Sequence, residues 1–290
     1  MSISISLIVL LAAALHAGWN AMLRAGADRL WSMTIMCIAI ALVCALTAPF
    51  APAPAPASWG YAIVSALLHV GYNLFLVRAY RSGDFGQTYP IARGSSPLLV
   101  LLGAALLAHE LPAPVNLMGV LLVSGGIVSL ALHGGGLDRR ALGYALGTGC
   151  FIGAYSVTDG IGVRLSGTPA GYTIWMCLLW GVMAPLVYVV ARDGRTLVRG
   201  PRETAIAAGG GIVSLIAYGL IIFAMSRGPM GPVSALRETS VVFAALIGRL
   251  FLKERLGAYR LIACVVVAIG AVCIGQAAAA PSRPSHAMRP

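Results

Sequence analysis

The chain has 290 residues, of which 59% are hydrophobic and only 10% are charged, and its mean hydropathy is +0.88. Water-soluble domains carry about 25% charged residues, so this composition excludes a water-soluble globular protein. The net charge of +11 comes from 20 basic and nine acidic residues. Because most of the basic residues lie between apolar runs, where Lys and Arg set membrane orientation, we expect no nucleic-acid partner.

Apolar runs follow one another along the whole chain, and each is long enough to cross about 30 Å of hydrocarbon as a helix. The first run has no charged segment before it and no clear cleavage site, so we interpret it as a retained span rather than a signal peptide. The alternating Ala/Pro segment 49–56 predicts a stiff, extended connection, and the Pro-rich tail 278–290 is predicted to be disordered. The ten predicted spans are 3–23, 31–50, 59–80, 85–108, 115–132, 141–163, 169–191, 203–226, 230–252 and 258–277.

The glycines and cysteines fit a bundle of helices in a membrane. Several glycines are four residues apart, as in Gly143/Gly147 and Gly149/Gly153, and small residues at this spacing let helices pack closely in lipid. The six cysteines are scattered through apolar runs without metal-ligand spacing, so we interpret them as small buried side chains. The sequence therefore predicts no metal site and no cofactor.

An internal repeat divides the chain into two halves, predicted as five-helix domains at 1–133 and 139–277. Because five is odd, the second half enters the membrane in the opposite sense, which makes an inverted repeat of the kind found in secondary transporters. The pairs that recur about 145 residues apart are 79–86 and 224–231, Arg93 and Arg237, and Glu110 and Glu254.

Several motifs resemble those of the drug/metabolite transporter superfamily, in particular its ten-span EamA-like transporter family. The resemblance covers residues 5–277 and implies an all-α integral membrane protein with ten transmembrane helices in two inverted five-helix repeats. It implies transport of a small metabolite without naming it, because the superfamily carries many kinds. The motifs are the glycine turn before a Pro-containing fourth span (Gly83, Gly86, Pro90, Pro97), the acids that close spans four and nine (Glu110, Glu254), and the segments 16–20, 89–97 and 236–240.

Arg93 and Arg237 fall near the middle of spans four and nine. An arginine at mid-bilayer costs about 2.5–3.5 kcal/mol on insertion scales, so we expect both side chains to point toward a central cavity. The guanidinium fork suits a carboxylate or phosphate, which favours an anionic or zwitterionic substrate. An internal ion pair with Glu238 or Asp159 is the alternative. We predict unequal roles, with Arg93 meeting the substrate and Arg237 held by an acid.

Other polar and aromatic residues share helical faces in otherwise apolar spans, and hydrogen bonding between helices is the alternative role for each. We predict a cavity lined by spans one, three, four, six, eight and nine. Pro90 and Pro97 should loosen the fourth span. His69 shares a face with Tyr72, but nothing in the second half mirrors it, which favours a structural role. The candidate substrate-binding residues are His16, Trp19, Asn20, Tyr72, Asn73, Tyr89, Arg93, Ser96, Tyr155, Tyr218, Arg237 and Ser240, and the candidates for proton coupling or ion pairing are Asp159 and Glu238.

Enzyme motifs such as HExxH and GxSxG are absent from the sequence, so we expect no enzyme. We predict a secondary-active exporter of a small polar metabolite that works by alternating access; an intramembrane enzyme and a structural, lipid-organising protein are the alternatives. A monomer is sufficient for this function. The connections after odd-numbered spans hold 13 basic residues, against 4 in the other connections and the termini. This bias places both termini outside the cytoplasm of a bacterial-type inner membrane, although many relatives are thought to have cytoplasmic termini.

Overall fold

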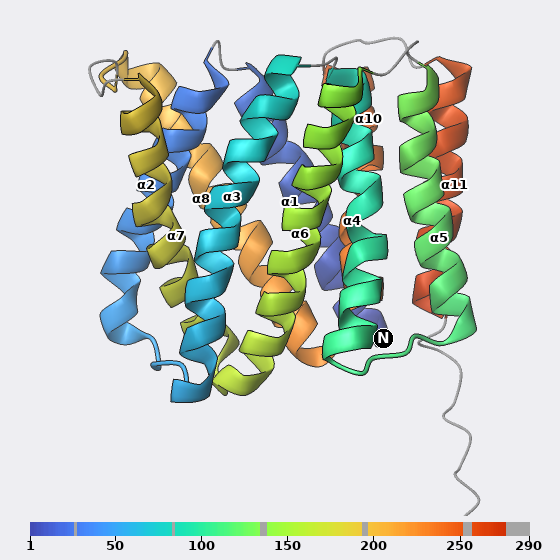
Figure 1. Ribbon diagram of the computed structural model, residues 1–290, viewed down its shortest axis with the longest axis horizontal. Helices are drawn as coiled ribbons and strands as arrows, with labels where there is room; N and C mark the ends of the chain where they lie inside the picture. Colours follow the sequence, from blue (N-terminus) through green and yellow to red (C-terminus); the bar gives the residue numbers. More distant parts are fainter. Residues whose placement is uncertain (26–27, 83–84, 134–137, 193–196, 252–256, 277–290) are drawn as a thin grey trace, which may run out of the picture.

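The computed structural model describes residues 1–25, 28–82, 85–133, 138–192, 197–251 and 257–276, and within these ranges it is all-helical. The helices run side by side in one bundle (Figure 1). Gly83, Glu254 and the predicted tail lie outside the described residues. In chain order the α-helices are α1 (Ile3–Ala25), α2 (Arg29–Thr47), α3 (Trp59–Ser82), α4 (Phe85–Leu107), α5 (Pro114–Ser129), α6 (Arg139–Ser166), α7 (Pro169–Arg192), α8 (Pro201–Arg227), α9 (Met230–Arg237), α10 (Ser240–Phe251) and α11 (Ala258–Gln276).

Short 3-10 helices occupy several connections. Helices η1 (Ala48–Phe50) and η2 (Pro56–Ser58) include the two ends of the Ala/Pro segment, so only its middle is extended. Helix η3 (Leu130–His133) follows α5. The prolines at the first or second positions of η1 and η2 explain these turns, because a helix does not need their missing amide hydrogen at that position.

Eight spans among the described residues are long and apolar enough to cross a membrane, one of them formed by α9 together with α10. Helix α5 is apolar but shorter, and α6 is rich in glycine and hydroxyl side chains, which lower its hydropathy. With these two helices the described part of the chain supplies the ten predicted spans. Large apolar side chains such as Leu42, Leu102 and Ile262 are exposed on the outside of the bundle, as a lipid-facing surface requires. The chain is an all-α multi-pass membrane protein.

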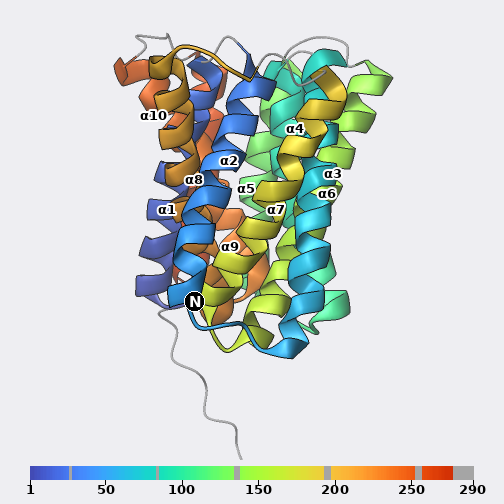
Figure 2. The same cartoon turned by 90° about the vertical axis from the view of Figure 1, so that its left-hand side faces the viewer.

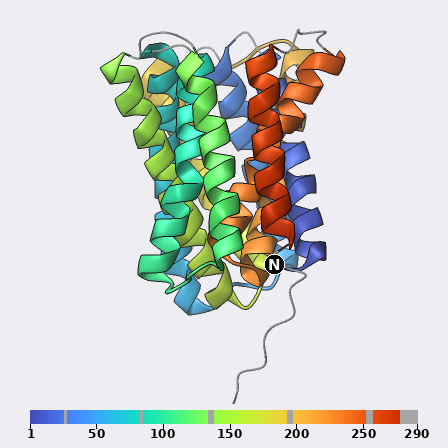
Figure 3. The same ribbon diagram turned by 90° about the vertical axis from the view of Figure 1, so that its right-hand side faces the viewer.

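Helices from the two halves of the chain pair with one another. Helix α2 packs against α7 (Figure 2), and α5 packs against α11 (Figure 3); each pair joins counterparts of the two predicted repeats. Helix α1 packs against α8, and their counterparts α6 and α3 also pack together. In Figure 1, α1 runs upward from the N-terminus whereas α6 runs downward. This arrangement is compatible with an inverted repeat.

Glycines allow the closest of these contacts. Gly119 of α5 and Gly270 of α11 face each other, and a Cβ atom on either would lie 2.8 Å from the carbonyl oxygen of the other. Gly153 of α6 packs against α4, where a Cβ would lie 2.8 Å from that of Leu99. Gly143 instead has open space around it, so our interpretation of that glycine as a packing residue is wrong.

A buried apolar cluster lies toward the end of the bundle that holds the N-terminus. It contains the buried side chains of Val9 in α1, Tyr172 in α7, Met225 in α8 and Val233 in α9. Helices α1 and α7 begin at this end and α8 finishes there (Figure 1).

The ninth predicted span, 230–252, is found as an apolar span over Met230–Ile247, but a turn interrupts its helix. Helix α9 ends at Arg237, Glu238 and Thr239 form a turn, and α10 begins at Ser240. The amides of Glu238 and Thr239 donate to carbonyls three residues earlier, which is tighter than an α-helix. The sequence predicted loosening in the fourth span instead, but α4 is continuous through Pro90 and Pro97.

Candidate functional site

A small central cavity of about 70 Å³ lies within the bundle. Helices α1, α3, α4, α6, α8 and α9 contribute to its wall, as the sequence predicts. Helices α2 and α7 also line it, with side chains that include Met33, Cys37 and Trp180, and this contribution was not predicted. Most of the side chains that these two helices contribute are apolar, so no polar pattern marked them as part of a site.

Three buried charged side chains meet at the wall of this cavity. Arg93 of α4 and Arg237 at the end of α9 both line the cavity, and Glu238 lies between them. The Nε atom of Arg93 is 2.7 Å from Oε2 of Glu238, and Nη2 of Arg237 is 3.2 Å from Oε1. All three side chains are at most 5% exposed. Two guanidinium groups therefore share one carboxylate, which leaves an excess of positive charge.

The structure corrects the premise behind the unequal roles predicted for the two arginines. The sequence left Arg93 without an acid and assigned Glu238 to Arg237, but Glu238 lies closer to Arg93. Adjacent residues of an unbroken helix point about 100° apart. Because Glu238 follows the last residue of α9, its side chain can reach both Arg237 and α4, which packs against α9.

Arg93 has further neighbours from three helices. Its Nη2 atom donates to Nε2 of His16 in α1 at 2.9 Å and to Oγ of Ser240 in α10 at 3.4 Å. The ring centre of Tyr89 is 5.8 Å from its Cζ atom. The Ser96 hydroxyl donates to the Arg93 carbonyl oxygen, a contact internal to α4. These partners hold the guanidinium in place at the cavity wall.

An aromatic cluster forms another part of the wall. The His69 ring stacks on Tyr155 with 3.9 Å between centres and also lies 5.1 Å from Trp180 and 5.5 Å from Tyr218. Tyr72 meets the edge of Tyr155 at 5.9 Å. His69 is thus at the centre of this cluster and lines the cavity. The sequence favoured a structural role for His69, because no residue in the second half mirrors it. Its only signal in the sequence was the face that it shares with Tyr72.

Asp159 is fully buried beside the aromatic cluster. Its Oδ1 atom accepts a hydrogen bond from the Tyr172 hydroxyl at 2.9 Å, and its Oδ2 atom accepts one from the Tyr218 hydroxyl. Among the described residues it forms no ion pair, so the alternative of an internal pair with an arginine is not found there. Because Tyr218 lines the cavity, a single side chain separates Asp159 from it.

The predicted substrate-binding residues divide into two groups. Asn20, Tyr89, Ser96 and Ser240 are outside the wall of the cavity; Ser240 reaches it through Arg93, whereas the Asn20 amide donates to the carbonyl of His16 within α1 at 2.8 Å. Those that line the cavity are His16, Trp19, Tyr72, Asn73, Arg93, Tyr155, Tyr218 and Arg237.

Part of the chain is similar to a known protein family. Residues 139–276 match the model of the EamA-like transporter family. This part of the chain, a little under half of its length, is thus similar to the EamA-like transporter family. A solved structure, described only as the crystal structure of a protein, has a TM-score of 0.74 and 19% identity, with 95% of this chain and 96% of that chain covered. This likeness shows that the two chains share their fold over nearly their full lengths. No curated protein matches the sequence.

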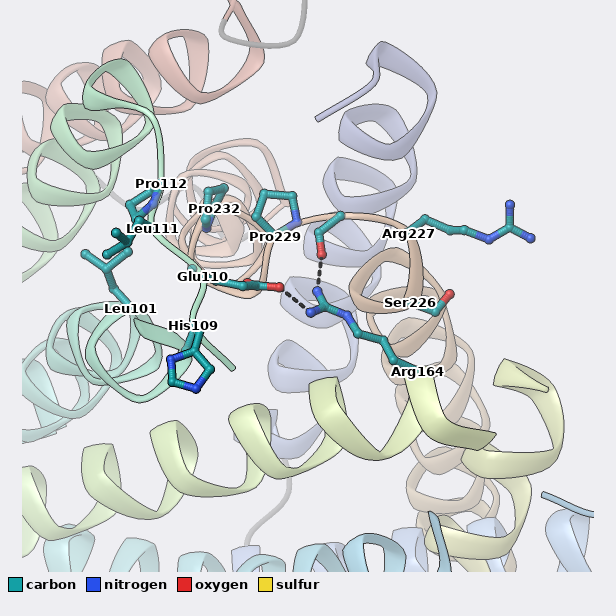
Figure 4. Close-up of a pocket in the computed structure, with 13 residues that line it drawn as sticks. Leu101, His109, Glu110, Leu111, Pro112, Arg164, Ser226, Arg227, Pro229 and Pro232 are labelled. Atoms are coloured by element: carbon teal, nitrogen blue, oxygen red, sulfur yellow. Dashed lines mark hydrogen bonds and ion pairs between the residues drawn. The ribbon is translucent and has the colours of Figure 1, made fainter. Parts of the chain in front are cut away.

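The protein has a second, larger cavity of about 560 Å³ (Figure 4). It is lined by the ends of α4, α6 and α8, the start of α9, and the connection between α4 and α5. Glu110 and Arg164 form an ion pair in its wall. The sequence analysis considered Glu110 only as the acid that closes a span and Arg164 only as a topology charge, so it missed their pairing across the two halves.

Proposed function

We propose that this chain is a secondary transporter that moves a small anionic or zwitterionic metabolite through the central cavity by alternating access. The observation that carries the proposal is the sharing of Glu238 by Arg93 and Arg237 in a buried wall. Buried charges need partners of opposite sign, and one carboxylate is too little for two guanidinium groups. A carboxylate or phosphate of a substrate would supply the missing negative charge with the geometry that guanidinium binds best.

The rest of the wall suits a polar metabolite. The rings of His69, Tyr155 and Tyr218 offer stacking surface, and their polar atoms offer hydrogen bonds. The cavity of about 70 Å³ is well below the roughly 300–1,000 Å³ of ordinary ligand sites. Substrate binding therefore requires the bundle to widen, and two related halves that rock about a central site would do so. Export is the direction that we predict.

We also propose that Asp159 carries the coupling proton. Its carboxylate is buried and held by tyrosine hydroxyls, with no counter-charge within bonding distance among the described residues. Tyr218 connects it to the cavity. In liposomes that contain the purified protein, Asp159→Asn should abolish solute accumulation driven by a pH gradient and retain exchange of solute against solute. Accumulation equal to that of the parent would remove Asp159 from this role.

A thermal-shift screen tests the substrate class. Purified protein is heated with amino acids, amines, organic acids or organophosphonates, and a ligand that binds the folded state raises the melting temperature. We expect anionic or zwitterionic compounds to stabilise the parent and to be then taken up by liposomes that contain it. Arg93→Gln should lose this stabilisation, whereas the exposed Arg227→Gln should keep it. Stabilisation by amines alone, or an undiminished shift in Arg93→Gln, would refute the proposed site.

A further inference from the structure

Glu110 of the first half contacts Arg164 of the second half (Figure 4), at the end of the bundle that holds the N-terminus (Figure 1). It lies in the connection between α4 and α5. One carboxylate oxygen pairs with Nη1 of Arg164, and the other accepts a hydrogen bond at 2.9 Å from the amide of Met230, the first residue of α9. The carboxylate thus holds the end of α6 and the start of α9 together. A negative charge is favourable at a helix start.

Arg164 fixes the other side of this contact. Its Nε atom donates to the carbonyl of Met225 at 3.0 Å, and its Nη2 atom donates to that of Gly228 at 2.7 Å. Both carbonyls lie at the end of α8, where helical carbonyls lack partners within the helix. Arg164 therefore stays bound to the second half when its contact with Glu110, which lies in the first half, is lost.

The contact lies between water and the apolar interior. The Glu110 and Arg164 side chains are 22% and 31% exposed, and they line the larger cavity. Behind them, Val100, Val157 and Met230 form a buried apolar cluster. Helices α4 and α9 are thus linked at two depths, by Arg93 and Glu238 beside the central cavity and by Glu110 and Met230 at the end.

We propose that Glu110 and Arg164 form the gate that closes this end of the transport path, an inference that rests on the proposed transport function. While the pair is intact, the connection between α4 and α5 is held against α6, α8 and α9. Opening separates Glu110 from Arg164 and Met230. Arg164, which belongs to α6, stays hydrogen-bonded to the carbonyls at the end of α8. Because a part-exposed ion pair contributes little to the stability of a fold, the gate opens without loss of the fold. A movement of Glu238 beside the cavity is transmitted to the gate by α4 and α9.

Thiol labelling measures the gate without any substrate. Cys177 is buried and lines the central cavity, so a variant in which the other five cysteines are replaced by serine reports access to that cavity. A membrane-impermeant maleimide is added only from the side that carries an N-terminal tag. We expect Glu110→Gln and Arg164→Gln each to raise the labelling rate about three- to tenfold, because each removes the ion pair that joins the two halves at this end.

Matched controls separate the gate from general loosening. Arg227→Gln removes an exposed cation at the same end, and Glu203→Gln removes an exposed acid near the start of α8; both should label at the parent rate. Parent-like labelling in Glu110→Gln and Arg164→Gln, or an equal rise in the controls, overturns the gate. Glutamine is nearly the same size as glutamate, so Glu110→Gln still tests the gate even if Arg164→Gln is unstable. The thermal-shift screen can succeed or fail independently of this result.

Discussion

Glu238 is fully buried between two guanidinium groups, and its removal therefore has a different effect from removal of either arginine. Without the carboxylate, two positive charges remain close together in the interior. Without one arginine, the remaining charges form a balanced pair. Uncompensated buried charge is strongly destabilising, by about 3–5 kcal/mol, whereas loss of one partner from a shared carboxylate leaves that carboxylate paired.

Glu238→Gln should accordingly lower the free energy of unfolding by about 3–5 kcal/mol, and Arg93→Gln or Arg237→Gln should lower it by about 1–3 kcal/mol. The measurement is thermal unfolding of the purified protein in detergent. High concentrations of a substrate anion should restore part of the loss in Glu238→Gln, because the anion replaces the missing charge. Equal destabilisation by all three changes would show that the charges do not act as one group.

At the scale of single residues, the sequence predicted most of the polar residues that line the central cavity but not how the charged ones pair. Arg93 and Arg237 were identifiable because charge inside an apolar span is costly and so demands an interior location. The shared role of Glu238 was not identifiable, since its direction depends on the turn that ends α9. The pairing of Glu110 with Arg164 was also missed, because it joins residues that are 54 positions apart and lie in different halves.

The contact between α5 and α11 is the element in which packing is most easily tested. Gly270→Val should clash with the Gly119 carbonyl oxygen, which lies 2.8 Å from the added Cβ. Overpacking of this kind costs about 1–3 kcal/mol, so the melting temperature should fall. Gly275→Val in the same helix is the matched control, because open space surrounds Gly275. If both variants melt alike, close approach at Gly270 does not hold these helices together.

Helix positions were largely predictable, because runs of apolar residues must cover the hydrocarbon thickness. The break in the ninth span was not. The prolines in α4 led to a prediction of loosening in that helix, yet the helix continues through them. In the ninth span the Thr239 hydroxyl donates to the Leu236 carbonyl at 2.7 Å, and Glu238 turns toward Arg93. Side-chain bonds of this kind compete with the helix, but their strength depends on neighbours that the local sequence does not reveal.

The basic residues predict the orientation of the whole molecule in the membrane. Arg29, Arg78, Arg139 and Arg202 lie at the helix ends opposite the N-terminus. Short loops rich in arginine stay in the cytoplasm, so we expect both termini on the other side. Alkaline phosphatase fused after Pro290 should be active, because it matures only outside the cytoplasm. Activity of a fused cytoplasmic reporter instead would reverse the orientation and the side on which the Glu110 gate opens.

The broken ninth span has a consequence for biogenesis. At about 1.5 Å per residue, neither α9, with eight residues, nor α10, with twelve, is long enough to cross the bilayer alone. The charged residues Arg237 and Glu238 lie where α9 ends and the turn begins. Each charge raises the free energy of insertion by about 2.5–3.5 kcal/mol. Arg93 is translated much earlier, so the first half already supplies the partner of Glu238 when the ninth span is made. We therefore expect the second half, expressed alone, to insert its ninth span less often than the full chain, as glycosylation mapping would record.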